Sequence, residues 1–483
     1  MNRTEINLSL VARRRPNRQD HPSCRLRRWL TMLLVLLITG ATGTGTAQIL
    51  DPVPARAASQ QLILDEVRLQ GATRTPMTTV YRYLGLQPGQ EITQQSLIQA
   101  VGQLKEGGLF RAVSFFTMPG SARGRLILVL EVEEHAFDFR WAAGNTDLDG
   151  WYLVPAMLSY DNPLGRGGLF DFQFRIGFRH SGVLLRYQQP PVGDSRTYWA
   201  AQLSSLSTDR PYFWKGMEYR HTVYSGGAGS VYGRRLGTTG RAEVGIRLEA
   251  IDVANSASVQ LGSEDGTLED GQSVPAEDLP EPVREALGTD FRAVLHTDWQ
   301  YDTRSKILRA GTPTGGFWGR AKGTFSFQGD RSHLGLQVDL RKFQEIPGGV
   351  LAGRMRTAWV GDEAAFYDRL FLGGVYSVRG FPVHALSAPG GDTWLVSGSL
   401  EYRTSILSNA QGSKLTGVLF LDAGASGQTG QPDPYSGVAL GAGYGVRWKV
   451  WWLDWVGVDV GFPLTDRPVD MNFQVTASIG WSF

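Results

Sequence analysis

The chain has 483 residues, of which 42% are hydrophobic and 19% are charged, and its formal net charge at pH 7 is +2. This composition excludes an intrinsically disordered chain, which would have low hydrophobicity and high charge. The single cysteine, Cys24, excludes a disulfide scaffold and a cysteine-rich metal site. The 60 glycines and the aromatic fraction of 11%, without long apolar runs after residue 40, favour a β-rich chain over a helical membrane protein.

The N-terminal region has the pattern of a secretory signal peptide. Its first 28 residues hold eight arginines against two acidic residues, and an apolar run from Trp29 to Ile38 follows. This order, with small residues up to Ala47, predicts a signal peptide over residues 1–47. A membrane anchor is the alternative, although the run is too short to span a bilayer. Removal of the segment leaves a mildly acidic chain, which argues against a nucleic-acid partner.

Residues 60–134 have the pattern of a small α+β domain, because helical periodicity and strand alternation follow one another over short distances. Thr75-Pro76 is typical of a helix start, with a capping residue before a proline. Glycines at Gly71, Gly85 and Gly107-Gly108 mark the ends of elements. The expected elements are a strand over 62–70, a helix from 75 to 85, a helix from 93 to 106, and strands over 111–118 and 125–133.

From about residue 136 the apolar residues recur at every second position, which predicts strands. The clearest examples are residues 169–178, 437–448 and 473–483, and in the last of these Trp481 and Phe483 are expected on the apolar face. A soluble sandwich also alternates, but here the apolar faces are aromatic and the opposite faces carry Gly, Ser and charges. A transmembrane barrel has this pattern, and in lipid the sheet must close. We therefore predict a membrane β-barrel of about 16 antiparallel strands over residues 136–483.

One polar segment, residues 254–288, interrupts the strand pattern. It is acidic and contains prolines. We expect a solvated loop outside the membrane, and a calcium-binding loop is the alternative.

Residues 60–134 resemble a POTRA domain, the polypeptide-transport-associated module of the bacterial periplasm. The resemblance rests on the order of elements, on "LGLQPGQEIT" between the helices, and on "LKEGGLFRAV" before the second strand. Leu109-Phe110 stands where the family keeps a packing corner. One copy is found. The resemblance implies a domain that binds extended chains along its sheet edge.

The barrel region resembles the BamA/TamA superfamily, also called the bacterial surface antigen family. The resemblance rests on "FYDRLFLGGVYSVRGF" at residues 366–381, with weaker agreement at 158–167 and 301–316. It implies a loop that folds back into the barrel and presents Val378, Arg379, Gly380 and Phe381 to the inner wall. The wall partners that it implies are Glu401, Phe420, Asp422 and Gly424. Trp481 and Phe483 look like the C-terminal signal that the outer-membrane assembly machinery reads.

The physical chemistry of the loop supports this assignment. An arginine in a narrow lumen loses water and needs a carboxylate, and Asp422 or Glu401 can accept its planar fork. Gly373, Gly374 and Gly380 permit sharp backbone turns. The alternative is that Arg379 is an exposed loop arginine.

The resemblance implies an outer-membrane assembly or translocation factor with its POTRA domain in the periplasm. Its partners would be unfolded outer-membrane or secreted polypeptides, the lipid bilayer with lipopolysaccharide, and periplasmic accessory proteins. A two-partner-type secretion pore and a structural or lipid-handling barrel are the alternatives. The sequence has no nucleophile elbow, metalloprotease motif, phosphate loop or Cys/His cluster, so we expect no enzyme, cofactor or metal site, although a His–Asp–Ser lipase in the lumen stays open.

Overall fold

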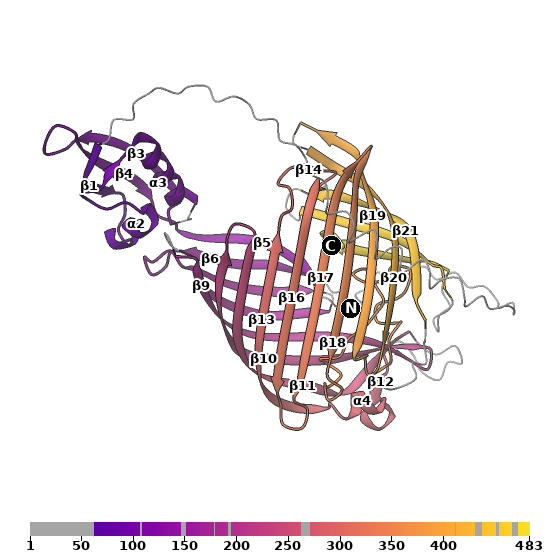
Figure 1. The fold of residues 1–483 in the computed structure, drawn as a ribbon. Helices are drawn as coiled ribbons and strands as arrows, with labels where there is room; N and C mark the ends of the chain where they lie inside the picture. The colour runs from indigo at the N-terminus through magenta and orange to yellow at the C-terminus, as the bar shows by residue number, and fades with distance from the viewer. Residues whose placement is uncertain are drawn as a thin grey trace, which may run out of the picture.

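A computed structural model describes residues 62–106, 109–145, 151–177, 179–191, 195–261, 271–410, 412–429, 437–450, 454–465 and 472–483. The described chain forms a small α+β domain and a closed β-barrel, and Figure 1 shows the domain beside one end of the barrel. We call the end of the barrel beside the α+β domain the near end, and we call the opposite end the far end. The predicted signal peptide lies outside the described residues.

The α+β domain is built from a mixed four-stranded sheet and two helices. Its strands follow the order β2-β1-β4-β3, and β1 and β4 are parallel. Both helices pack on the sheet through an apolar core in which Leu64, Leu104 and Leu128 are fully buried. The predicted order of elements is present, with the short strand β2 in addition. The elements are β1 (Leu62–Gln70), α2 (Met77–Leu84), β2 (Glu91–Ile92), α3 (Gln94–Glu106), β3 (Ala112–Pro119) and β4 (Arg125–Glu133).

The start of α2 differs from the expectation. Pro76 is the N-cap residue, and no side chain caps this helix. The hydroxyl of Thr75 donates to Glu134 at 2.7 Å instead. The end of α2 agrees with the sequence pattern, since Gly85 ends it with a left-handed φ of 66°.

Glu134 joins the domain to the barrel. Its carboxylate accepts hydrogen bonds from the hydroxyls of Thr73 and Thr75 and from the backbone N–H groups of residues 73–75. Thr75 also accepts from Asn162, in the first near-end turn of the barrel, at 2.8 Å. Burial raises the pKa of Glu134, but the hydrogen bonds from Thr75 and Thr73 outweigh burial and lower it to about 2. The carboxylate therefore stays charged at neutral pH.

Within the described residues, the barrel wall has sixteen antiparallel strands besides β12, which confirms the predicted number. The three-residue strand β12 adds to them at the far end, and β23 lies beside β5 to close the sheet. The strands are β5 (Phe137–Asn145), β6 (Trp151–Asp161), β7 (Leu169–Gly177), β8 (His180–Gln189), β9 (Thr197–Trp214), β10 (Met217–Leu236), β11 (Gly240–Leu261), β12 (Ser273–Pro275), β13 (Gly288–Asp302), β16 (Gly315–Phe327), β17 (His333–Ile346), β18 (Gly349–Val360), β19 (Trp394–Asn409), β20 (Gly412–Gly427), β21 (Ala439–Val450), β22 (Asp454–Pro463) and β23 (Gln474–Ile479).

The alternation of side chains along the strands agrees with a barrel in lipid. In β21, Tyr444, Val446 and Trp448 are exposed on the outer face. Gly441 and Gly445 of the same strand face the lumen, where a Cβ atom would overlap Arg379 or Asp459. The outer surface is therefore apolar and the inner surface is polar, as expected. No described helix is both long and apolar enough to cross a membrane.

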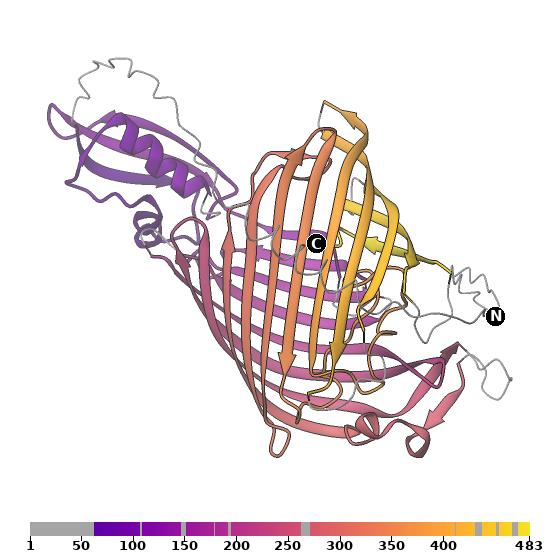
Figure 2. The same cartoon turned by 45° about the vertical axis from the view of Figure 1, so that its right-hand side comes forward.

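The strands differ in length around the barrel, as Figure 2 shows. β9, β10 and β11 have 18, 20 and 22 residues, and we call them the tall wall. β5 and β23 have only 9 and 6 residues, and we call their boundary the seam. Hydrogen bonding along the seam is therefore limited by the six residues of β23.

A short hairpin reaches across the near-end opening. It comprises residues 303–314, between β13 and β16, and contains β14 (Leu308–Arg309) and β15 (Thr312–Pro313). Its turn is at Ala310, whose carbonyl accepts a hydrogen bond from Thr416 of β20 at 3.1 Å. Arg403 of β19 donates to Thr312 at 2.7 Å. The hairpin thus contacts β19 and β20, which are three and four strands away from β16 in the sheet order.

The expectation of a fully solvated loop over 254–288 is wrong for the described part of that segment. β12, a 3-10 turn (Ala276–Asp278) and α4 (Glu281–Arg284) form a cap at the far end. Val274, Leu279 and Val283 are buried in one cluster with residues of β10 and β11. The segment folds because these apolar residues are spaced among the acidic ones. Among the described residues, no group of three or more His, Cys, Asp or Glu side chains is arranged to hold a metal ion.

The expected outward direction of Trp481 and Phe483 is also wrong. β23 follows the predicted alternation, with Val475 exposed, but it ends at Ile479. Gly480 then adopts a φ of 87° and turns the chain into the lumen. We call residues 480–483 the end segment. Phe483 is 8% exposed and packs on the inner wall rather than toward lipid.

Candidate functional site

The loop between β18 and β19, residues 361–393, folds back into the barrel, and we call it the lumen loop. Gly373, Gly374 and Gly380 adopt φ values of 114°, 97° and 96° in it. Other residues rarely adopt such values, so the three glycines are required by the path of the loop. Val378 and Phe381 at the tip are fully buried. They pack in a small apolar cluster with Leu372, Leu386 and Ala439.

The inner wall under the tip is made of small residues. A Cβ atom at Gly441 of β21 would overlap the carbonyl oxygen of Arg379. The Cβ position at Gly424 of β20 lies 2.8 Å from Cγ2 of Val378. The alternating glycines of the sequence therefore form a flat surface on which the backbone of the loop tip lies.

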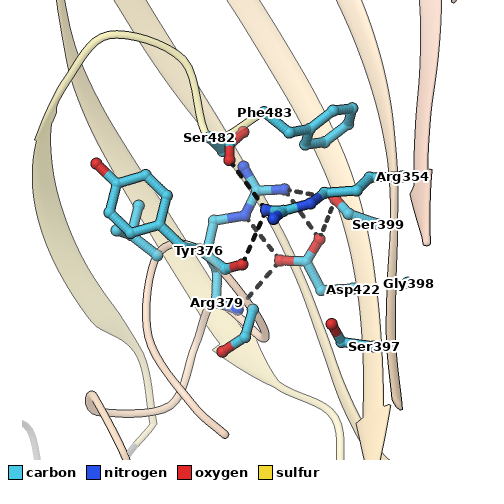
Figure 3. A pocket seen from close by; sticks show the side chains of 11 residues that line it. Arg354, Tyr376, Arg379, Ser397, Gly398, Ser399, Asp422, Ser482 and Phe483 are labelled. Carbon is cyan, nitrogen blue, oxygen red and sulfur yellow. Dashed lines mark hydrogen bonds and ion pairs between the residues drawn. The ribbon is translucent and has the colours of Figure 1, made fainter. Parts of the chain in front are cut away.

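Arg379 points into this wall and binds Asp422 through two parallel hydrogen bonds. Its Nε donates to Oδ2 at 2.7 Å and its Nη2 donates to Oδ1 at 2.9 Å. The backbone N–H of Arg379 also donates to Oδ2, at 3.1 Å. Ser399 donates to the same carboxylate at 2.6 Å, as Figure 3 shows. The guanidinium carbon lies 3.6 Å from the ring centre of Phe420, which adds a cation–π contact.

Four further charged residues extend this pair into what we call the lumen network. Nη1 of Arg379 lies 2.6 Å from Glu401 and 3.8 Å from Asp459. Glu401 also binds Arg403 at 2.8 Å, and Asp459 binds Arg447 at 2.7 Å. The network has three cations and three anions: Arg379, Arg403, Arg447, Glu401, Asp422 and Asp459. All six side chains are at most 2% exposed, so the equal numbers of charges offset the cost of their burial.

The structure brings together all the residues that the motif implies for the loop and the wall. Glu401 and Asp422 both contact Arg379, Phe420 lies under its guanidinium, and Gly424 lies under Val378. Trp481 and Phe483 lie beside the same network, through Arg403.

Sequence reasoning missed Arg403, Asp459 and Arg447 as members of the site. Strand alternation is the signal that could have found them. Arg403 follows Glu401 by two positions, and Asp459 alternates with Gly457 and Gly461 on β22, so each faces the lumen with its predicted neighbours.

The root of the lumen loop, residues 364–368, is held at the far end by apolar contacts and hydrogen bonds. Phe366 and Tyr367 are buried in the cluster that includes the cap and the tall wall. The hydroxyl of Tyr367 donates to Asp290 at 2.8 Å. Further along the loop, Nδ1 of His384 donates to the carbonyl oxygen of Pro211 at 2.6 Å. The loop is therefore held on both sides of its tip.

Solved structures with the same fold include BamA from Haemophilus ducreyi lacking POTRA domains 1–3. It is 16% identical, with a TM-score of 0.67, and the match covers 86% of this chain and 84% of that one. CdiB from Acinetobacter baumannii and CdiB from Escherichia coli are 14% and 15% identical, with TM-scores of 0.52 and 0.50. These matches cover 86% and 87% of this chain and 73% and 76% of the two CdiB chains.

Sequence comparison leads to the same group of proteins. No curated protein sequence matches the chain. The model of the Omp85 superfamily domain matches residues 162–483, which include all of the lumen loop, its wall partners and the end segment. Because the matched region covers most of the barrel, the chain belongs to the Omp85 superfamily and is an outer-membrane β-barrel.

Proposed function

We propose that this protein is an outer-membrane assembly factor that captures unfolded polypeptides with its POTRA-like domain and inserts them through the seam of its barrel. In this proposal the near end faces the periplasm and the far end faces the cell exterior. Unfolded outer-membrane or secreted proteins are the clients, and periplasmic accessory proteins and lipopolysaccharide are further partners.

The single observation that carries the proposal is the short seam. β23 contributes six residues beside β5, and Gly480 then turns the chain away from the wall. The strands of the tall wall, by contrast, pair along most of their 18 to 22 residues. A sheet edge with few hydrogen bonds separates at low cost, and an exposed edge accepts another strand. The energy for insertion would come from the hydrogen bonds of the client and from its burial in lipid.

The α+β domain supports capture of extended chains. β3 is an edge strand of its sheet, and Phe116 and Met118 on it are exposed. An extended client can add to this edge by main-chain hydrogen bonds and place alternate side chains against the two apolar residues. Glu134 and Asn162 keep the domain beside the near end, so a captured chain is presented to the barrel.

Secretion through the barrel is the second candidate, because the fold is also that of CdiB. The occupied lumen favours insertion over passage. The lumen loop, the far-end cap and the near-end hairpin all lie in the path of a chain crossing the barrel along its axis.

The test is reconstitution of the protein without residues 1–47 in liposomes with a urea-unfolded barrel protein as client. The readout is the rate at which protease-protected, folded client appears. One engineered cysteine in β5 and one in β23 would close the seam by a disulfide. The matched control carries cysteines at Tyr232 and Val244, which face one another on β10 and β11 and do not need to separate.

Acceleration that is lost with the seam disulfide, restored by reduction, and unaffected by the control disulfide is the expected result. Full activity with the seam closed would overturn insertion through the seam. No acceleration over empty liposomes, together with ion conductance in a planar bilayer, would favour a secretion pore. Neither acceleration nor conductance would favour a structural or lipid-handling barrel.

A further inference from the structure

The inner face of β11 presents cations to a part of the lumen that the lumen loop does not fill. Val244, Ile246 and Leu248 are exposed on the outer face of this strand, so Arg241 and Arg247, at the alternate positions, point into the lumen. Their side chains are nevertheless 47% and 40% exposed. Because these arginines face inward and are still exposed, the lumen beside this part of the wall is accessible to solvent.

The exposed arginines bind carboxylates that lie deeper in the wall. The two arginines of β11 pair with Glu243 and Glu249 of the same strand, which are only 18% and 8% exposed. Arg320 of β16, 41% exposed, pairs with Asp298 of β13, 5% exposed. An arginine side chain is long and keeps its charged head in water, whereas the shorter carboxylates stay near the strands. The surface that faces the lumen is therefore positive, although each pair is neutral.

Neighbouring strands add cations to the same inner face. Lys322 follows Arg320 by two positions on β16 and therefore shares its face. On β17 and β18, Arg341 and Arg354 both bind the single carboxylate of Asp339, at 2.8 Å. Cations thus outnumber carboxylates among these residues. The lumen-facing cations of β11, β16 and β17 form what we call the cationic strip: Arg241, Arg247, Arg320, Lys322 and Arg341.

The ion pairs of the cationic strip are of a kind that a ligand can replace. An ion pair with an exposed partner contributes little to stability, because water competes for its charges. The lumen network differs, since its charges are at most 2% exposed and the loss of one leaves its partner buried and unpaired. The guanidinium groups of the strip can therefore turn to another anion at little cost.

The cationic strip has the dimensions of an extended chain rather than of a single small anion. Arg241 and Arg247 are six residues apart on β11, which at about 3.4 Å per residue corresponds to about 20 Å. An extended peptide with acidic residues at alternate positions places its carboxylates on one side along such a length. β11 begins beside the near-end hairpin, because the backbone N–H of Asp302 donates to the carbonyl oxygen of Thr239 at 2.8 Å. The strip is therefore reached from the near end.

We propose that the cationic strip binds an acidic polypeptide segment, in extended conformation, that enters the lumen from the near end. The inference rests on the proposed function and deepens it, because an unfolded client is the source of such a segment. A phosphorylated lipid fits less well, since β11, β13, β16 and β17 pair continuously along the strip and close this wall to the membrane. Acidic residues of a client are thus held away from lipid, where a charge is costly.

The test uses the protein without residues 1–47 in phosphatidylcholine nanodiscs and two fluorescein-labelled peptides. Each peptide has about eight residues, enough to span the strip at about 3.4 Å per residue. One alternates aspartate with serine, and the other alternates asparagine with serine. Fluorescence anisotropy measures the dissociation constants for the unaltered protein and for the strip variant, Arg241→Gln with Arg247→Gln. We expect the aspartate peptide to bind the unaltered protein about tenfold more tightly than the asparagine peptide, with a difference that added salt reduces.

The strip variant should fold, because it leaves no carboxylate of β11 without a partner. Glu243 accepts a hydrogen bond from the hydroxyl of Tyr198 at 2.6 Å, and Glu249 keeps its ion pair with Arg292 at 3.1 Å. The variant lacks two of the exposed cations and should bind the aspartate peptide about fivefold more weakly, as expected for two exposed contacts between charges. Its affinity for the asparagine peptide should not change.

A matched control removes the same charge from outside the lumen, by Arg68→Gln with Arg234→Gln. Arg68 is 47% exposed on the α+β domain, and Arg234 alternates with the exposed Tyr232 on the outer face of β10. This control should leave both dissociation constants unchanged. Equal weakening in the strip variant and the control, or equal binding of the two peptides, would overturn the strip as a binding site. Loss of peptide binding when the nanodiscs contain lipopolysaccharide would assign the strip to phosphate groups and overturn the acidic segment as its ligand.

The peptide experiment and the liposome experiment fail separately. Binding of the aspartate peptide without acceleration of client folding would support the cationic strip and overturn the assembly function. Acceleration of client folding with no preference for the aspartate peptide would retain the assembly function and overturn the strip.

Discussion

The root and the tip of the lumen loop are held by different forces. At the root, Phe366 and Tyr367 lie in an apolar cluster with the tall wall and the far-end cap. At the tip, Arg379 lies among buried charges on β19, β20 and β22. The stabilising free energy of apolar packing scales with the area removed from water, so the root can lose contacts one at a time with a proportional loss of stability. A buried charge network depends on each member, because removal of one leaves its partner unpaired.

The root and the tip of the loop also rest on different parts of the barrel wall. The root rests on the tall wall, where long strands pair along most of their length. The tip rests on β19 to β22, and its partner Glu401 contacts the end segment beyond β23. The loop therefore connects the tall wall to the side of the barrel that contains the seam. The buried charge network, which depends on each of its members, lies on the seam side. Substitutions at the two ends should reveal this difference directly.

The largest effect is expected for Arg379→Ala. This substitution removes the cation and leaves the carboxylates of Asp422 and Glu401 buried without it. Breaking a buried ion pair in this way lowers the free energy of unfolding by about 3–5 kcal/mol. The measurement is the urea midpoint of unfolding in detergent micelles, followed by tryptophan fluorescence. Asp422→Asn should cost less, since the amide oxygen still accepts one hydrogen bond. In the double variant the two costs should fall well short of their sum, whereas full additivity would show that the pair is not a unit.

The second effect concerns the flat wall beneath the tip. Gly441→Ala would place a methyl group on the carbonyl oxygen of Arg379, and overpacking of this kind costs about 1–3 kcal/mol. Gly226→Ala on β10 is the matched control, because the nearest atom to its Cβ position is 3.8 Å away. The control should change the urea midpoint little. Equal effects of the two substitutions would mean that strand propensity, rather than the loop, requires glycine at Gly441.

The third effect tests the root. Val283→Ala on α4 removes two methyl groups from a fully buried position, and we expect a cost of about 2 kcal/mol. Because apolar packing is not a network of charges, combination with Asp422→Asn should be additive within about 0.5 kcal/mol. The urea midpoints of the two single variants and the double variant measure this directly. A coupling larger than about 1 kcal/mol would show that root and tip act as one unit.

Much of the fold could be predicted because it depends on short-range patterns, whereas the pairing at the centre of the site was implied by the resemblance of the loop motif to a known family. Strand alternation placed Glu401, Phe420 and Asp422 on the inner face, and it could have placed Asp459 there too. The direction of Trp481 and Phe483 could not be predicted, because one glycine with a left-handed φ reverses the alternation. The contact of Arg403 with Thr312 depends on a hairpin that crosses the lumen, about ninety residues away in the chain. Such contacts depend on closure of the whole barrel, which no local pattern contains.

The smallest effect is expected for Glu134→Gln, at the junction between the α+β domain and the barrel, outside the membrane. Glu134 also binds its partners by charge-assisted hydrogen bonds, but the residue is only partly buried, so Glu134→Gln should cost about 1 kcal/mol, less than loss of a charge in the lumen network. Burial raises its pKa, but the hydrogen bonds from Thr75 and Thr73 outweigh burial and lower the pKa to about 2, compared with 4.5 in an unfolded chain. A carboxylate with a lowered pKa contributes its stability above pH 4.5 and loses it as the pH falls towards 2. Protease resistance of the link between domain and barrel should fall over this range in the unaltered protein. In Glu134→Gln it should already be low at neutral pH and vary less with pH, and an unchanged profile would show that the junction is held by other contacts.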